Sequence, residues 1–538
     1  MIYKLVKNIQ KINVSYIYLA FILFSLYFTF TLSNIYFNSL SGADNYKYIE
    51  NIFFIFGKSE NAFDNQGLFY FFYVAMFIKM RTGSFNYSED SIFLSETIQI
   101  ANLTLFCFGI LGYYLLSKKL KINKNLSFLL IIFFIYFPSF YYLRLNMKPE
   151  ILAFALVPWI FYFFESYLET KLKINVAFIA IGTSILISSK GSIGAMIIFC
   201  LFIKFIVHIK LFNFKNIIYG FSILLICWFG ILGENYLLNI GNILDREPEE
   251  QYDNLAPIDI LYSLDGERLL KDPKKDYHKD SLIAITLIDL LGDYFELNWK
   301  EDSVLFSKNI KPLIVGSQLN PEINYPKLLN INWGSKNIVY SGPGQNYLKY
   351  FQNYIGLLYS LLFIFMTFYY FFRETIPNKI YISFPFFGII ILLINSLFGF
   401  PQNNFDPLVG DTLKVFYYSF LIPLPILIIF KNLKRIKIKN LIFVILFTLF
   451  TLINLGFPKS NNENLDLAIK SKVENTVLCE VNKIFIEPTF ITDNNIDCQE
   501  IDPGNKINTG IIKIPLFSTM LYIVFFIYSL FRIKKDDK

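Results

Sequence analysis

The sequence predicts an all-α polytopic membrane protein with about 12 transmembrane helices. Of its 538 residues, 54% are hydrophobic and 17% are charged, whereas soluble proteins carry about 25% charged residues. Apolar runs of roughly 17 to 24 residues recur along almost the whole chain, which is the length that a helix needs to cross a bilayer. Strands of a membrane barrel would alternate polar and apolar residues over about ten positions. Helices therefore fit the pattern better.

The predicted spanning helices follow these runs, and one further run is too short to span. Residues 67–80 contain five consecutive aromatic residues and end beside Lys79 and Arg81, so we predict a juxtamembrane helix that lies in the outer interface. The predicted spans are 16–34, 94–117, 126–143, 149–168, 174–189, 193–207, 217–233, 353–372, 380–399, 413–430, 441–457 and 515–531.

The distribution of lysine and arginine predicts the orientation. The net charge is +7, but the cations form short clusters between apolar runs, which indicates membrane topology rather than a nucleic-acid surface. If 67–80 does not span, every predicted inside segment is basic, and both termini are cytoplasmic. The first apolar run has no small-residue cleavage site and is predicted to remain as a membrane helix. Richness in Phe, Ile, Asn and Lys is typical of an AT-rich bacterial genome, so we predict a bacterial cytoplasmic (inner) membrane protein.

The predicted topology divides the chain into three parts. Residues 1–233 form a seven-helix module with an outer loop at 35–93, residues 234–352 form a large extracytoplasmic loop, and residues 353–538 form a five-helix region with an outer loop at 458–514. Within the large loop, 281–299 reads as an amphipathic helix that lies on the mouth of the bundle. Cys479 and Cys498 share the last outer loop, where a periplasmic disulfide is plausible.

Familiar catalytic motifs are absent from the sequence. It contains no Walker sequence and no G-x-S-x-G, and His208 and His278 are its only histidines. These two are predicted on opposite sides of the membrane, so a histidine-based metal site or triad is disfavoured. Any chemistry must then use carboxylates, lysine, arginine and tyrosine.

Four cations depart from the charge rule because they are predicted outside or at the outer membrane edge: Arg144, Lys148, Lys190 and Lys414. Each could extend its charged end to the interface or contact lipid head groups. Taken together they favour a site for a lipid phosphate, because basic pockets between helices bind such groups.

Four acids are predicted on the same side: Asp44, Glu50, Asp64 and Glu150. A carboxylate near the interface can act as the base for a sugar hydroxyl. Each acid also has a simpler explanation. The loop acids are ordinarily solvated, and Glu150 at a helix start interacts favourably with the helix dipole.

The layout and several short segments resemble the C-type glycosyltransferase (GT-C) superfamily, in particular protein O-mannosyltransferases and lipid A aminoarabinose transferases. Ala43-Asp44 resembles the family's first-loop acid, and 144–150 resembles its arginine-plus-acid segment. Lys190 in SSKGSIG and Lys414 in KVFYYSFLIPLP resemble its lysine-glycine and basic helix-start segments. The segment DNQGLFY, which begins at Asp64, resembles its interfacial segment without the two prolines. Glu150 stands where aspartate is usual.

The resemblance implies an inverting glycosyltransferase that uses a polyprenyl-phosphate-linked sugar at the extracytoplasmic face. Asp44 and Glu150 are the expected catalytic acids, Arg144, Lys190 and Lys414 are expected to bind the donor phosphate, and Glu50 and Asp64 are possible substrate or metal contacts. The acceptor is a glycan, lipid or protein, and a divalent metal is left open.

Two other functions stay open from the sequence. One is an O-antigen-type polymerase or ligase, and the other is a non-enzymatic flippase or transporter of lipid-linked sugars. A transporter would show interrupted helices in paired halves or charges near the bilayer midplane. The sequence shows no repeat, and its charges gather at the outer edge.

Overall fold

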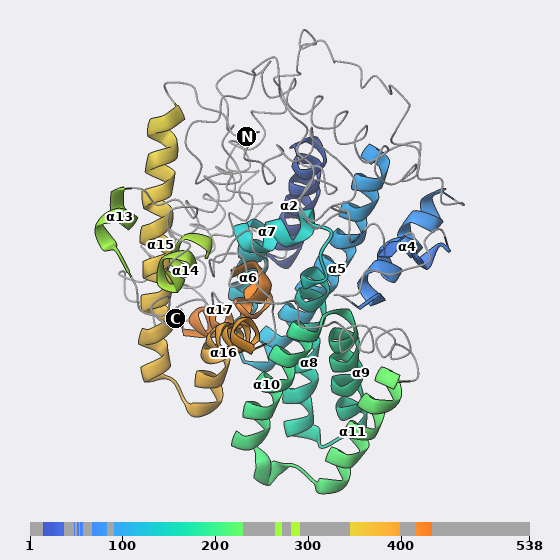
Figure 1. The fold of residues 1–538 in the computed structure, drawn as a ribbon. Coiled ribbons are helices and arrows are strands. Elements are labelled where there is room, and N and C mark those ends of the chain that lie inside the picture. The colour runs from blue at the N-terminus through green and yellow to red at the C-terminus, as the bar shows by residue number, and fades with distance from the viewer. Residues whose placement is uncertain are drawn as a thin grey trace, which may run out of the picture.

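The computed structural model describes residues 14–36, 48, 51–52, 54–57, 67–82, 91–229, 264–271, 281–290, 345–398 and 415–432. These residues form helices and their connections, with no strand among them (Figure 1). The helices are α2 (Val14–Tyr36), α4 (Phe69–Thr82), α5 (Ser91–Lys119), α6 (Lys124–Tyr136), α7 (Pro138–Leu145), α8 (Glu150–Thr170), α9 (Lys173–Ser189), α10 (Gly191–Val207), η1 (Ile209–Leu211), α11 (Phe214–Cys227), α13 (Gly266–Lys271), α14 (Leu282–Asp289), α15 (Gln345–Arg373), α16 (Ile376–Phe398), η7 (Val415–Leu421) and α17 (Pro423–Asn432).

The all-α prediction is confirmed for this part of the chain. Three of its helices contain stretches long and apolar enough to cross a membrane, at Glu96–Lys119, Glu150–Thr170 and Ile376–Ile394. Large apolar side chains on the outer helices are exposed, among them Phe178, Phe202 and Phe365, as is usual for surfaces that face lipid rather than water. The predicted spans 441–457 and 515–531 lie outside the described residues.

Helix α8 lies between α5 and α9 and also contacts η7. Glycine permits the close approach of α5 to α8: a Cβ atom on Gly109 would lie 2.8 Å from the carbonyl oxygen of Phe154. Phe106 and Phe154 stack nearby with ring centroids 4.8 Å apart. An alanine at Gly109 would therefore push the two helices apart.

The predicted single span 126–143 is wrong, because the structure divides it into α6 and α7. Phe137 between them is extended, with φ −68° and ψ 125°. It precedes Pro138, whose ring disfavours helical geometry in the preceding residue, and proline is well suited to begin the next helix. Helix α7 runs in a different direction from α6 (Figure 1).

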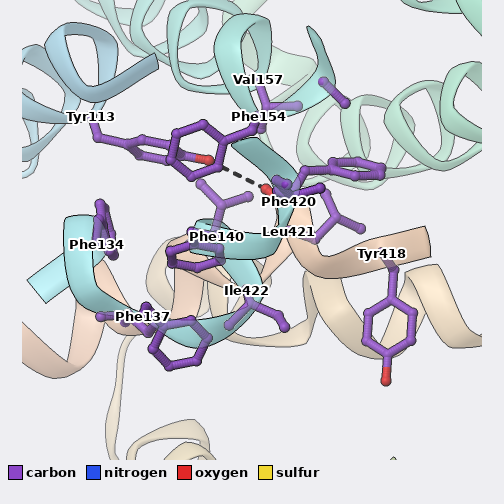
Figure 2. Packing of buried hydrophobic residues seen from close by; sticks show 14 of the residues in the cluster. Tyr113, Phe134, Phe137, Phe140, Phe154, Val157, Tyr418, Phe420, Leu421 and Ile422 are labelled. Carbon is purple, nitrogen blue, oxygen red and sulfur yellow. Dashed lines mark hydrogen bonds between the residues drawn. The ribbon is translucent and has the colours of Figure 1, made fainter. Parts of the chain in front are cut away.

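The predicted helix 413–430 also differs, because its first half is the 3₁₀ helix η7 and only its second half is the α-helix α17. In a 3₁₀ ladder the carbonyl of Phe420 would accept from residue 423, but Pro423 has no N–H. The hydroxyl of Tyr113 donates to that carbonyl instead, at 3.2 Å (Figure 2). This bond joins α5 to the junction between η7 and α17, within a cluster of buried aromatic side chains.

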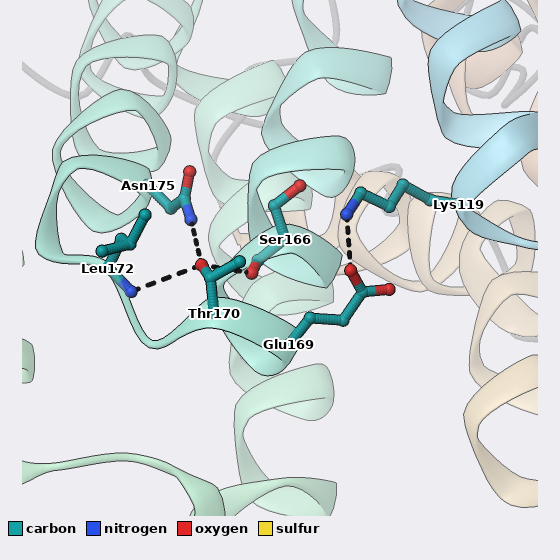
Figure 3. Close-up of polar contacts among 6 residues, drawn as sticks. All are labelled: Lys119, Ser166, Glu169, Thr170, Leu172 and Asn175. Atoms are coloured by element: carbon teal, nitrogen blue, oxygen red, sulfur yellow. Dashed lines mark hydrogen bonds and ion pairs between the residues drawn. The ribbon is translucent and has the colours of Figure 1, made fainter.

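The end of α8 turns sharply into α9. Lys171 adopts a left-handed conformation with φ 58°, and the hydroxyl of Thr170 accepts from Asn175 Nδ2 at 3.0 Å (Figure 3). At the same end Lys119 and Glu169 form an exposed ion pair of 2.6 Å. Helices α8 and α9 therefore run antiparallel with a short connection.

The large loop contributes α14, which contacts α15 and η7. Ser281 caps its first turn by accepting a hydrogen bond from Ala284 N–H at 3.1 Å, and Ile285 and Ile288 are fully buried. The amphipathic helix predicted at 281–299 is confirmed over Leu282–Asp289.

Candidate functional site

The structure describes three of the predicted site residues: Arg144, Glu150 and Lys190. It brings Glu150 and Lys190 into direct contact. Asp44, Glu50, Asp64 and Lys414 lie outside the described residues, as do Cys479 and Cys498, so their predicted roles stay predictions.

Glu150 and Lys190 form a buried ion pair. Lys190 Nζ lies 2.6 Å from Glu150 Oε1, and the side chains are 16% and 0% exposed, respectively. The second carboxylate oxygen, Oε2, has no hydrogen-bond partner among the described residues. The pair thus combines a partly exposed lysine side chain with a buried carboxylate.

The helix junctions determine where the two side chains lie. Glu150 is the first residue of α8, and Lys190 is the single residue between α9 and α10. Lys190 is extended, its N–H donates to Leu186 O at 3.1 Å, and its carbonyl accepts from Gly194 N–H at 3.0 Å. A one-residue connection with both backbone groups bonded leaves little freedom to the Lys190 backbone, and so fixes the point from which its side chain extends.

Tyr417 of η7 completes the site with an aromatic ring between two lysines. Lys190 Nζ lies 4.4 Å from the centre of this ring and Lys148 Nζ lies 5.7 Å from it. Lys148 also lies 5.9 Å from the ring of Tyr48. Such cation–π contacts are stronger where water is excluded, and Lys148 is only 4% exposed.

Three charged side chains are described at this site. Lys148 and Lys190 carry positive charges and Glu150 carries a negative charge. The first turns of α8 and α10 begin here, and the positive end of a helix dipole attracts anions. In α8 the N–H groups of Ile151 and Leu152 already donate to the carbonyls of Lys148 and Pro149. A partly desolvated ammonium group also interacts more strongly with an anion than one in bulk water.

Arg144 is directed to different partners. Its guanidinium donates to Thr29 Oγ1 of α2 at 2.9 Å and to Ile135 O at 3.3 Å, and it lies 4.7 Å from the ring centre of Phe106. Ile135 is in the last turn of α6, where the final carbonyls have no partner within the helix. These contacts show Arg144 joining α2, α6 and α7 where the predicted span is interrupted.

A second buried ion pair was missed by the sequence reasoning. Lys204 of α10 bonds Glu165 Oε1 of α8, and the hydroxyl of Tyr381 of α16 donates to the same oxygen at 2.7 Å. Lys204 is fully buried. Both charges lie within apolar runs, which is the signal that could have identified them. These two charges lie apart from those predicted at the outer edge.

The two pairs lie toward opposite ends of α8, because 15 residues of helix separate Glu150 from Glu165 by about 22 Å. No three His, Cys, Asp or Glu side chains come together to hold a metal ion anywhere in the described ranges.

His208 follows α10 and lies near this second pair. Burial and the positive charge of Lys204 lower the pKa of His208 from its usual value of 6.5, and Lys171 contributes in the same direction, while Glu165 opposes them. Near pH 6, His208 therefore binds a proton more readily in the unfolded chain than in the folded protein. Protonation then favours the unfolded chain, so stability is lost as the pH falls below about 6.5. We expect the melting temperature in detergent micelles to fall over this range, and the fall to be smaller in His208→Asn. Identical pH profiles would contradict this prediction.

Comparison with known proteins places the chain in no established group: no protein-family model matches it, and no curated protein matches it. The function is therefore inferred from the residues and their geometry.

Proposed function

We propose that the protein is an integral-membrane glycosyltransferase that transfers a sugar from a polyprenyl-phosphate donor to an acceptor at the extracytoplasmic face of a bacterial inner membrane. The observation that supports this most is the buried Glu150–Lys190 pair, with Lys148 and Tyr417 beside it. Two lysines beside one aromatic ring, at the starts of two helices and largely shielded from solvent, suit the phosphate of a lipid-linked sugar.

The proposed reaction is a single displacement. Asp44 accepts the proton of the acceptor hydroxyl, whose oxygen forms a bond to the anomeric carbon with inversion. The bond between that carbon and the phosphate oxygen breaks, and its electron pair stays on the departing polyprenyl phosphate. Lysines already in position stabilise the charge that develops there more than they stabilise the ground state. Lys190 and Lys148 would serve this purpose, with Lys414 as a further predicted contact.

Glu150 orients Lys190 in this proposal. Its bond to Nζ uses one of the three ammonium donors, which leaves two for phosphate oxygens. Arg144 would act indirectly, by holding in place the end of α7, which the 146–149 turn follows.

Asp44→Asn tests the base directly. We expect the protein to insert and fold normally but to transfer sugar about 10²- to 10⁴-fold more slowly, because asparagine cannot accept the proton. The assay measures release of polyprenyl phosphate from synthetic polyprenyl-phosphate mannose and polyprenyl-phosphate aminoarabinose. Glu169→Gln, an exposed acid at the opposite end of α8, is the matched control. Undiminished transfer by Asp44→Asn would contradict the assignment.

A second candidate, a transporter of lipid-linked sugars, is favoured by one observation. The interrupted segments α6–α7 and η7–α17 contact each other, and Phe133 lies 5.6 Å from Phe430, measured between ring centres. Paired interrupted helices are typical of secondary transporters. In proteoliposomes, movement of a fluorescent lipid-linked sugar between leaflets without release of polyprenyl phosphate would favour transport over transfer.

A further inference from the structure

Hydrogen bonds link α4 and the residue Gly67 before it to both chain segments that form the Glu150–Lys190 pair. The first contact is at Gly67, just before the helix, whose N–H donates to the carbonyl of Ser189 at 3.1 Å. Ser189 is the last residue of α9 and the immediate neighbour of Lys190. The entry to α4 is thus bonded directly to the backbone that presents the lysine.

Glycine is required for this contact. A Cβ atom on Gly67 would lie 1.5 Å from the carbonyl oxygen of Ser188 and 3.2 Å from the Cα atom of Ser189. These are backbone atoms that a rotamer change cannot remove. Any other residue at position 67 would therefore separate α4 from the α9–α10 junction.

The second contact reaches the glutamate through a chain of hydrogen bonds. The hydroxyl of Tyr70 donates to Asn102 Oδ1 of α5 at 2.8 Å. Asn102 Nδ2 in turn donates to the carbonyls of Arg144 and Asn146, at 3.0 and 2.8 Å. These carbonyls belong to the segment that ends in the turn before Glu150.

Both members of this chain are fully buried. Burial raises the pKa of Tyr70 far above its usual value, and the bond to Asn102 only partly offsets this. Its hydroxyl therefore stays protonated and can donate. Asn102 uses its oxygen and both amide hydrogens, so it has one orientation that satisfies all three bonds.

We infer that Gly67, Tyr70 and Asn102 are positioning residues that hold the Lys190 junction and the 144–150 segment at the spacing the ion pair needs. As a statement about catalysis, this rests on the proposed function. Helix α4 lies within the predicted first outer loop (35–93), so the same contacts join that loop to the pair. In the hydrogen bonds described, Gly67 and Tyr70 bond to Ser189 and Asn102 rather than to Lys190 or Glu150.

The structure offers a matched control on the same helix. Tyr73, one turn further along α4, also donates to α5, at Ala101 O over 3.3 Å, and bonds Thr104. Neither partner contacts the 144–150 segment in the hydrogen bonds described. Tyr70→Phe and Tyr73→Phe each remove one hydroxyl that joins α4 to α5, but only Tyr70→Phe interrupts the path to the 144–150 segment.

The test measures how fast an amine-reactive acetylating reagent modifies Lys190 in the full-length protein in micelles, by mass spectrometry. We expect Tyr70→Phe to raise this rate about three- to tenfold, the factor that one hydrogen bond of ordinary strength represents. The reason is that the amine is no longer held against a carboxylate. Tyr73→Phe should match the parent. Equal rates in the two variants would overturn the inference.

Gly67→Ala extends the test to the other contact, with Gly266→Ala as its control because a Cβ atom at Gly266 meets nothing within 4 Å. Faster modification of Lys190 in Gly67→Ala alone supports the inference, and equal rates in both alanine variants contradict it. If Gly67→Ala does not fold, the two tyrosine variants still decide the matter.

Sugar transfer distinguishes this inference from the proposed function. In Tyr70→Phe we expect kcat to fall with little change in KM, because the site is misaligned but still present. If Lys190 modification responds as expected and the parent protein transfers no sugar, the positioning role stands and the transferase proposal fails.

Discussion

Replacing Glu165 with leucine is expected to lower the free energy of unfolding by about 3–5 kcal/mol, because it leaves a fully buried ammonium group without its counter-charge. Lys204 is 0% exposed in its side chain and lies 3.8 Å from the ring centre of Tyr381. That ring attracts the cation but cannot replace the carboxylate. Unfolding by denaturant in mixed micelles measures the effect.

Two variants define what this result means. Glu169→Gln, which breaks the exposed pair with Lys119 at the same end of α8, is expected to change stability by less than about 0.5 kcal/mol. The double variant Glu165→Leu/Lys204→Met removes both buried charges and should recover most of the loss. If Glu165→Leu lowers the free energy of unfolding no more than Glu169→Gln does, the buried pair does not hold α8, α10 and α16 together.

Replacing Lys190 with methionine is expected to reduce both sugar transfer and stability. It removes a partly exposed ammonium group from the proposed phosphate site and should slow sugar transfer about 10²- to 10³-fold. It also leaves the buried Glu150 carboxylate unpaired. The helix start of α8 offsets part of that cost, so we expect a loss of stability of about 2–3 kcal/mol.

The double variant Lys190→Met/Glu150→Gln separates the two effects. Glutamine has a similar shape and no charge, so stability should return while transfer stays low. Release of polyprenyl phosphate and denaturant unfolding are measured on the same preparations. Recovery of transfer together with stability would show that Lys190 has only a structural role.

Much of the helical architecture could be predicted from the apolar runs. The helices α5, α8, α9 and α10 begin and end within a few residues of their predicted bounds, because lipid-facing and buried helices share one long apolar pattern. Interruptions were harder to predict. Pro138 and Pro423 lie within apolar runs that look continuous in the sequence. A proline can break a helix or be accommodated in it, and the outcome depends on which group replaces the hydrogen bond that proline cannot donate.

The residues of the candidate site could likewise be predicted only in part from the sequence. Lys190 and Glu150 could be chosen from the sequence because each is a charge at the edge of an apolar run. Tyr70, Asn102 and Tyr417 gave no such signal, since isolated polar and aromatic residues are common throughout this chain. Arg144 was grouped with the phosphate ligands by its charge, and that role stays a prediction; the structure shows its guanidinium donating to Thr29 and Ile135.

The sequence by itself determined that the chain is helical and apolar, and which cations and acids stand at the ends of its runs. Only the tertiary structure decided which charges meet. An ion pair depends on the relative position of two helices, and that position is set by contacts distant in sequence, such as Gly67 against Ser189 and Glu165 against Tyr381. Hydrophobicity specifies that helices bury their faces, but it does not specify their register.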